Sequence, residues 1–191
     1  MPHGIMLKKM GLFPAYREAI FVQNGEEPSL SEPGRLGWEL FYNVNLLVDI
    51  SNSKISFCDS LETLQEYGYK IENFSKAPLL LDRGLIEFES QTSQGLLRCV
   101  LDTGSTFNFL HIELEKAQKI EQILWEDDNI VNYSSFEIDK KNFGPIYFHK
   151  MPIKIPIHID AILGMDFFRE HIVFIDFKRR AIYFSNCSDI N

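Results

Sequence analysis

The segment Cys99-Val100-Leu101-Asp102-Thr103-Gly104-Ser105-Thr106 decides the fold expected for this chain of 191 residues. Its apolar residues can form the end of a strand, which then delivers the triplet Asp102-Thr103-Gly104. The triplet alone is a weak signal, because Asp, Thr and Gly often form an ordinary turn. Its context strengthens it, since the apolar run Ala161-Ile162-Leu163-Gly164 follows downstream at the start of a β-rich tail. Asp102 is therefore the first candidate functional residue.

The sequence around the triplet predicts a mainly β structure. Residues 79–89 read as a strand, 91–95 as a turn and 96–101 as the returning strand that leads to Asp102. Apolar residues at helical spacing predict an amphipathic helix over 112–125, which we expect to pack on its own sheet. Residues 136–157 are again β-like. We therefore expect an all-β fold with short helices.

An internal repeat extends this prediction to the rest of the chain. Leu36-Gly37-Trp38-Glu39-Leu40-Phe41 aligns with Leu163-Gly164-Met165-Asp166-Phe167-Phe168 at an offset of 164 − 37 = 127 positions. The match continues without a gap, and Val48-Asp49 aligns with Ile175-Asp176. Such self-similarity is typical of a duplicated structural unit.

Each copy of the repeat predicts the same structure, a short helical turn followed by a β-hairpin. The hairpins comprise residues 46–50 with 53–57, and 172–177 with 181–184. In the second hairpin, Lys178-Arg179-Arg180 forms the bend. Two homologous β lobes are implied.

These patterns give a division of the chain into three parts. We expect a partial first lobe in residues 1–60 and a connector with a short helix in residues 61–75. An intact lobe that carries Asp102 follows in residues 76–191.

The D-T-G triplet, followed downstream by two apolar residues and Gly, resembles the aspartic protease superfamily. Ile162-Leu163-Gly164-Met165-Asp166-Phe167 is particularly similar to the retropepsin-like branch. The resemblance implies an acid-protease fold, pepsin-like or retropepsin-like, with closed barrel lobes and a short helix in each. It implies that Asp102 is the catalytic carboxylate. The supporting residues of the active-site loop would be Thr103, Gly104, Ser105 and Thr106, and those packed beneath it Ile162, Leu163 and Gly164.

The same resemblance implies a role for each residue next to Asp102. Thr103 would form a hydrogen bond across the lobe interface, Gly104 would leave room near the active water, and Ser105 would orient the carboxylate. A flap that closes over the substrate would lie between residues 106 and 157, and the turn at Phe143-Gly144 is our candidate for it.

The implied activity is hydrolysis of a polypeptide by water activated between two carboxylates, which share a proton and titrate separately. No metal or organic cofactor is expected. Asp102 precedes Gly164 by 164 − 102 = 62 positions, but only 36 residues precede Gly37, and no Asp occurs before Asp49. Asp49 and Asp176 are not substitutes, because they lie in the hairpins. The second carboxylate would come from a homodimer formed through the Asp102 loop or from a missing N-terminal segment.

An alternative function remains open at this point. The chain could be a catalytically inactive binding or dimerisation module that keeps the acid-protease fold without a working pair of carboxylates. The sequence favours hydrolysis but does not identify the substrate.

Composition excludes several other classes of protein. The formal net charge of −8 and a pI near 5.1 argue against a nucleic-acid partner. No stretch has the roughly 20 apolar residues that a membrane span needs. The three cysteines lack CxxC spacing and the five histidines lack metal-ligand spacing, so neither a metal site nor a disulfide framework is expected. No signal peptide is visible in residues 1–10, and the compartment stays unassigned.

Overall fold

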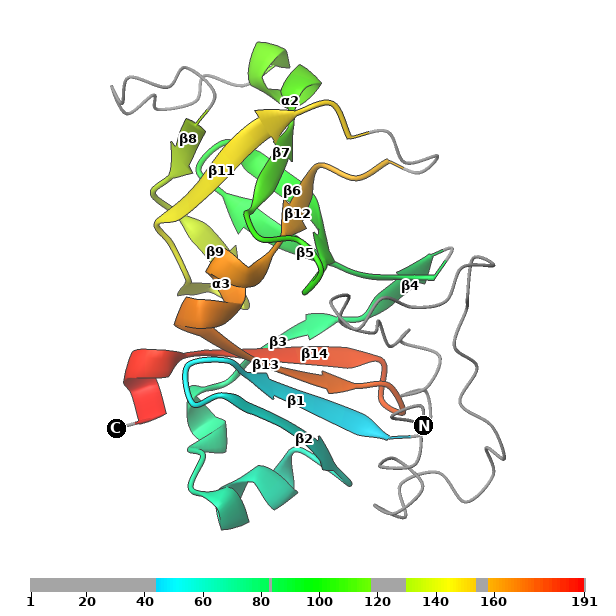
Figure 1. Cartoon of the computed structure of the whole chain (residues 1–191), viewed down its shortest axis with the longest axis vertical. Coiled ribbons are helices and arrows are strands. Elements are labelled where there is room, and N and C mark those ends of the chain that lie inside the picture. Colours follow the sequence, from blue (N-terminus) through cyan, green and yellow to red (C-terminus); the bar gives the residue numbers. More distant parts are fainter. Residues whose placement is uncertain (1–43, 83, 118–129, 154–157, 191) are drawn as a thin grey trace, which may run out of the picture. The chain divides into compact units, whose positions relative to one another are not determined.

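Strands make up most of the described chain (Figure 1). The computed structural model describes residues 44–82, 84–117, 130–153 and 158–190, which lie in the unit formed by Gly37–Asn191. The helices in these ranges are short. The predicted all-β fold class is confirmed.

The strands form two sheets. The first has the order β2-β1-β13-β14-β3. Its strands are β1 (Asn45–Asp49), β2 (Lys54–Cys58), β3 (Ser75–Pro78), β13 (His171–Asp176) and β14 (Ala181–Asn186).

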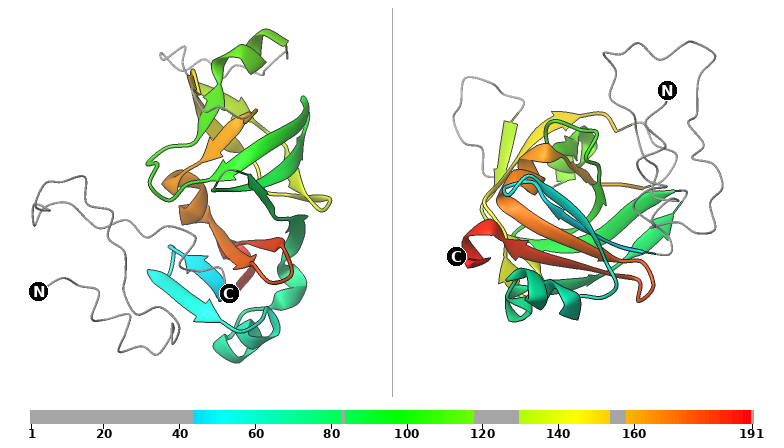
Figure 2. Two further views of the ribbon diagram at one scale, coloured as in Figure 1. Left: turned by 90° about the vertical axis from the view of Figure 1, so that its right-hand side faces the viewer. Right: turned by 60° about the horizontal axis from the view of Figure 1, so that its bottom comes forward.

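The second sheet has the order β10-β9-β5-β6-β12-β7-β11-β8, with β4 paired to β5, and it curls on itself (Figures 1 and 2). Its strands are β4 (Leu80–Asp82), β5 (Leu85–Thr92), β6 (Gly95–Leu101), β7 (Phe109–His111), β8 (Ile130–Tyr133), β9 (Phe136–Ile138), β10 (Lys141–Asn142), β11 (Ile146–Met151) and β12 (Ala161–Leu163). The pairs β6–β12 and β7–β11 are parallel.

The helical elements are single turns or little more. They are η2 (Glu62–Tyr67), η3 (Ile71–Asn73), α2 (Ile112–Ala117), α3 (Met165–Glu170) and η4 (Cys187–Ile190). The predicted connector helix corresponds to η2. The predicted helix over 112–125 begins as α2, and its residues from 118 lie outside the described residues.

The prediction of one continuous strand over residues 79–89 is wrong. Residues 79–89 contain two antiparallel strands, β4 and β5, with Leu80 opposite Glu87. Gly84 lies in the turn between them with φ +83°. Glycine adopts this left-handed conformation without a steric penalty, which suits it to a tight turn between two paired strands.

The repeat is visible as an internal two-fold symmetry of the first sheet. In the antiparallel pair β1–β13, Leu47 lies opposite Phe174. Because 174 − 47 = 127, these two residues are counterparts in the repeat, and the symmetry axis passes between them. Both predicted hairpins are present, and their registers agree, with Val48 opposite Ile55 and Ile175 opposite Ile182.

The turns of the two hairpins are also built alike. Asp49 accepts a hydrogen bond through Oδ1 from the Asn52 N–H at 3.1 Å, and Asp176 accepts one through Oδ1 from the Arg179 N–H at 2.8 Å. Both aspartates are buried, with 0% and 1% of their surfaces exposed. They therefore shape the two turns.

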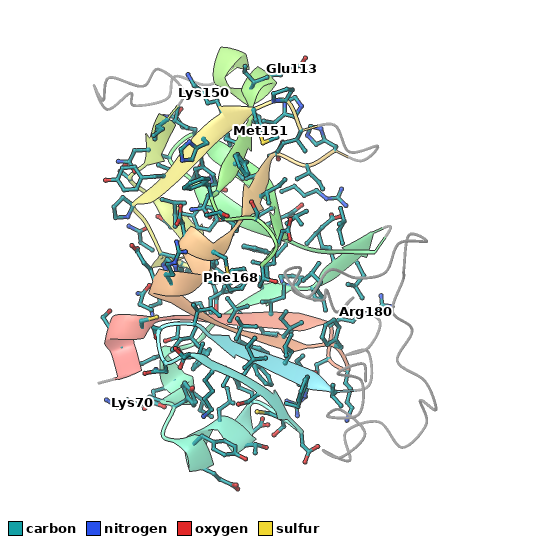
Figure 3. All side chains as sticks on the ribbon, in the orientation of Figure 1. Lys70, Glu113, Lys150, Met151, Phe168 and Arg180 are labelled. Carbon is teal, nitrogen blue, oxygen red and sulfur yellow. The ribbon has the colours of Figure 1, made fainter. Side chains whose placement is uncertain are left out.

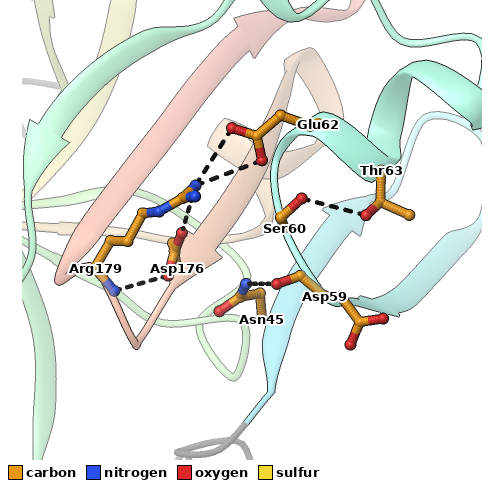
Figure 4. Close-up of polar contacts among 7 residues, drawn as sticks. All are labelled: Asn45, Asp59, Ser60, Glu62, Thr63, Asp176 and Arg179. Atoms are coloured by element: carbon orange, nitrogen blue, oxygen red, sulfur yellow. Dashed lines mark hydrogen bonds and ion pairs between the residues drawn. The ribbon is translucent and has the colours of Figure 1, made fainter.

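The residue that follows each of these two N–H donors has a positive φ, which is unusual for a residue other than glycine. Ser53 has φ +53° and Arg180, its counterpart at 53 + 127, has φ +49° (Figure 3 labels Arg180 at the bend). In the second hairpin, the Arg179 side chain also contacts Asp176 and Glu62 (Figure 4). The geometry of the turn is thus kept although, apart from the aspartate, the residues that form it differ.

Apolar side chains cover both faces of the first sheet. On one face, the buried cluster under η2 and η3 consists of Leu47, Cys58, Leu64, Tyr69, Ile172 and Phe174. On the other face, Phe184 lies 4.7 Å from Phe88 and 6.1 Å from both Phe143 and Phe167, measured between ring centroids. These ring contacts join the first sheet to α3 and to the second sheet.

Candidate active site

The Asp102 loop, which we define as residues 102–108, connects β6 to β7. Between these two strands lies β12, with Leu163 opposite Leu101 in the parallel pair and Ile162 opposite Phe109 in the antiparallel pair. Both ends of the loop are therefore held by strands that pair with β12. The structure brings Ile162 and Leu163 directly against the strands that carry the loop.

Gly164 follows β12 and lies against the loop itself. A Cβ at this position would overlap the Phe107 carbonyl oxygen and would lie 2.7 Å from the Ser105 carbonyl oxygen. The Asp102 N–H donates to the Leu163 carbonyl at 3.0 Å, and the Met165 N–H donates to the Ser105 carbonyl at 2.8 Å. Only glycine permits this close approach of two backbones.

Within the loop, the backbone orients the candidate carboxylate. The Gly104 N–H donates to Asp102 Oδ1 at 2.9 Å, and a Cβ at Gly104 would lie 3.0 Å from the same oxygen. The Ser105 N–H donates to the Asp102 carbonyl at 3.1 Å. Gly104 therefore both contacts the carboxylate and leaves space beside it.

The hydrogen bond of the Ser105 hydroxyl differs from the one that the resemblance implied. Its hydroxyl donates to the Phe107 carbonyl at 2.9 Å and not to the Asp102 carboxylate. It supports the loop by closing a local turn. The Gly104 N–H has the orienting contact that the resemblance assigned to Ser105.

The loop presents its first residues to solvent. Asp102, Thr103, Gly104 and Thr106 are exposed, and Phe107 is 45% exposed. The expected contact of Thr103 across a lobe interface stays a prediction. An exposed carboxylate on a fixed backbone is accessible to water, to a polypeptide and to a second carboxylate.

Asn108 is a supporting residue that the sequence did not identify. It is 3% exposed, and its Oδ1 accepts the Gly164 N–H at 2.9 Å while its Nδ2 donates to the Tyr147 carbonyl at 3.2 Å. Its own carbonyl accepts the His149 N–H at 2.8 Å. Asn108 thus ties the loop to Gly164 and to β11. The signal in the sequence that could have identified Asn108 is its position as a polar residue directly before the apolar strand β7.

The candidate flap turn does not have the geometry of a free hairpin. Phe143 is 2% exposed, and its N–H donates to the Phe136 carbonyl at 2.7 Å. Its carbonyl lies 3.0 Å from Nε2 of the buried His171. Because Phe143 belongs to the core, this turn does not fit the closing element that the resemblance implies.

The described residues contain one candidate carboxylate at this site. Among them, no hydrogen bond or ion pair joins Asp102 to a second carboxylate. Likewise, no group of three or more His, Cys, Asp or Glu side chains in the described ranges could hold a metal ion. In the same part of the chain, no helix has the length and apolar character needed to cross a membrane.

Two solved structures resemble this chain in fold. The retropepsin-like aspartic protease from Rickettsia conorii has 17% sequence identity and a TM-score of 0.43, and the match covers 58% of this chain and 90% of that one. Basic 7S globulin from soybean has 10% identity and a TM-score of 0.43, with 78% of this chain and 54% of that one covered. Both are likenesses of fold. No family model matches the sequence, and no curated protein sequence matches it.

Proposed function

We propose that this chain supplies one half of an aspartic endopeptidase site, with Asp102 as its catalytic carboxylate and a polypeptide as its substrate. The observation that carries the proposal is the exposed Asp102 carboxylate, which accepts the Gly104 N–H on a loop held against Gly164. A loop fixed in this way keeps the carboxylate in one orientation, and catalysis depends on such fixed positions.

The chemistry needs a second carboxylate beside Asp102. In the charged form, one carboxylate takes a proton from water while the water oxygen attacks the carbon of the scissile carbonyl. The other carboxyl group, which is protonated, donates to the carbonyl oxygen. Breaking the C–N bond then releases an amine, which receives a proton, and a carboxylic acid. The proposed reaction uses no cofactor.

Two sources could provide the second carboxylate. In the first, two copies of the chain meet through the Asp102 loop, so that each provides one Asp102. In the second, another polypeptide segment of the same kind provides its own D-T-G loop. The exposure of residues 102–104 is compatible with both sources.

Hydrolysis of an unfolded protein substrate between about pH 3 and about pH 7 tests the proposal. We expect activity that pepstatin inhibits and that Asp102→Asn abolishes. Asp139→Asn is the matched control, because Asp139 is exposed and has φ +50°, a conformation that Asn tolerates well. Inactivity of the wild-type chain, both alone and with a supplied second half, would instead favour the binding module.

A further inference from the structure

One face of the second sheet carries a row of neighbouring side chains that begins beside the Asp102 loop. The row consists of residues that lie opposite one another in successive strands, namely Val100 in β6, Ile162 in β12, Phe109 in β7 and His149 in β11 (Figure 1). Residues that lie opposite one another point to the same face of a sheet. Asp102 comes two positions after Val100, so the candidate site lies at the first strand of this row.

At β7 and β11 the side chains on this face become aromatic. The His149 ring lies 4.7 Å from the Phe107 ring and 6.1 Å from the Phe109 ring, measured between ring centroids. Tyr147 comes two positions before His149 in the same strand and therefore points to the same face. Phe107 is 45% exposed and Tyr147 is 48% exposed. We call Phe107, Tyr147 and His149 the aromatic platform.

The backbone at Asn108 fixes the aromatic platform in place. The Asn108 carbonyl accepts the His149 N–H at 2.8 Å, and its side chain donates to the Tyr147 carbonyl at 3.2 Å. The two strands that carry the platform are also paired, with His149 opposite Phe109. A surface that is already ordered loses little conformational entropy when it binds a ligand.

An open surface of this kind suits a planar cation better than an apolar side chain. The rings of Phe107 and Tyr147 keep almost half of their surface in water, so an apolar group laid on them would itself stay partly exposed and gain little from burial. A guanidinium group stacks on an aromatic ring with one face while the N–H groups at its edge stay hydrated. The formal net charge of −8 also attracts a positively charged polypeptide.

We propose that the aromatic platform binds an arginine side chain of the polypeptide substrate and thereby selects cleavage sites that have an arginine at a set distance from the scissile bond. Neighbouring strands lie about 4.8 Å apart, so the three spacings from β6 to β11 amount to about 14 Å. An extended polypeptide advances about 3.3 Å per residue, which places the arginine about four residues from the scissile bond. The inference rests on the proposed function for the cleavage itself and not for the binding.

Three labelled peptides that differ at one position test the binding without hydrolysis. Each is added to the full chain with the substitution Asp102→Asn, which prevents cleavage, and fluorescence anisotropy gives the dissociation constant. The variable residue is arginine, its uncharged analogue citrulline, or phenylalanine. We expect the arginine peptide to bind about three- to tenfold more tightly than either of the other two.

Substitutions in the same Asp102→Asn background identify the side chain that provides this preference. Tyr147→Ser should remove most of the preference for arginine, because it deletes one ring of the platform. Tyr147→Phe should keep the preference, since the face of the ring is retained. Tyr67→Ser is the matched control, because Tyr67 is 58% exposed and lies in η2, outside the second sheet. This control should leave the preference unchanged, and circular dichroism confirms that each variant is folded.

Three outcomes would overturn the inference. The first is equal binding of the arginine and citrulline peptides. The second is tightest binding of the phenylalanine peptide, which would make the platform an apolar site. The third is a preference for arginine that Tyr147→Ser leaves unchanged or that Tyr67→Ser removes to the same extent, which would attribute it to the net charge of the chain.

The binding assay also separates this inference from the proposed function. A preference for arginine, together with a wild-type chain that hydrolyses no substrate even with a supplied second half, would contradict the proposed function and keep the arginine site. Hydrolysis by the wild-type chain, together with equal binding of the three peptides, would contradict the arginine site alone.

Discussion

Asn108 and Gly164 are joined by a hydrogen bond of 2.9 Å between the Asn108 Oδ1 and the Gly164 N–H, across 56 positions of sequence. The bond links the end of the Asp102 loop to the residue on which the loop rests. Since Asn108 is buried, its loss would leave the Gly164 N–H and the Tyr147 carbonyl without their partner.

We expect Asn108→Ala to lower the free energy of unfolding by about 1–3 kcal/mol, the usual cost of unsatisfied buried polar groups. Asn108→Ser should not restore stability, because its hydroxyl is too short to reach both partners. Urea denaturation measures both variants. Unchanged stability in Asn108→Ala would show that the bond does not hold the loop.

Gly164→Ala should be far more damaging than an ordinary glycine substitution. The new Cβ would overlap the Phe107 carbonyl, which is backbone and can move only if the Asp102 loop moves. Gly68→Ala is the control, because Gly68 has φ +89° but nothing lies within 4 Å of its Cβ position, so only backbone strain of about 1–2 kcal/mol applies. Thermal denaturation compares them. Equal losses in the two variants would argue against the close approach at Gly164.

Arg98→Ala should destabilise the chain through the carboxylate that it leaves behind. Arg98 Nε lies 2.6 Å from Glu87 Oε2, and the Glu87 side chain is 0% exposed. Removing one member of a fully buried ion pair costs about 3–5 kcal/mol, and the loss here should be smaller because the Arg98 side chain is 32% exposed. The double variant Arg98→Met with Glu87→Gln should recover part of this loss, and chemical denaturation measures it. A double variant that is less stable than Arg98→Ala would contradict this explanation.

His171 should make stability depend on pH. Burial lowers the pKa of His171, while acceptance by the Phe167 and Phe143 carbonyls and the charge of Glu170 act in the opposite direction. Because the pKa in the folded state lies below the ordinary value of 6.5, the unfolded chain binds more protons between the two values. The stability that neutral His171 contributes is full above pH 6.5 and falls as the pH drops through that window.

The measurement is the free energy of unfolding between about pH 5 and about pH 8 in the wild type and in His171→Gln. We expect the variant to lose much of the slope near pH 6. His158→Gln is the control, because the His158 side chain is 84% exposed. An unchanged slope in His171→Gln would assign the dependence to other groups.

The sequence predicted those parts of the fold that local patterns encode. The offset of 127 and the apolar alternation placed both hairpins, whereas the position of Gly164 beneath the Asp102 loop was implied only by the resemblance. The break at Gly84 was missed, although Asp82-Arg83-Gly84 interrupts the apolar residues and is itself a turn signal.

The supporting contacts of the site could not be predicted in the same way. Asn108 forms hydrogen bonds with Gly164 and Tyr147, and His171 forms one with Phe143. In each case the two partners are distant in the sequence. Ser105 was given the orienting contact that the Gly104 N–H makes, since a resemblance assigns roles to side chains and not to backbone groups. Hydrogen bonds between distant segments depend on the assembled fold, so no local pattern indicates them.

The pairing of Leu47 with Phe174 has a consequence for how the two halves can differ. In an assembly of two identical chains, a residue on the symmetry axis meets its own copy, so every substitution there occurs twice. In this sheet the two positions belong to one chain and carry different side chains. Each half can therefore change its side chains alone while the register between the two halves stays fixed.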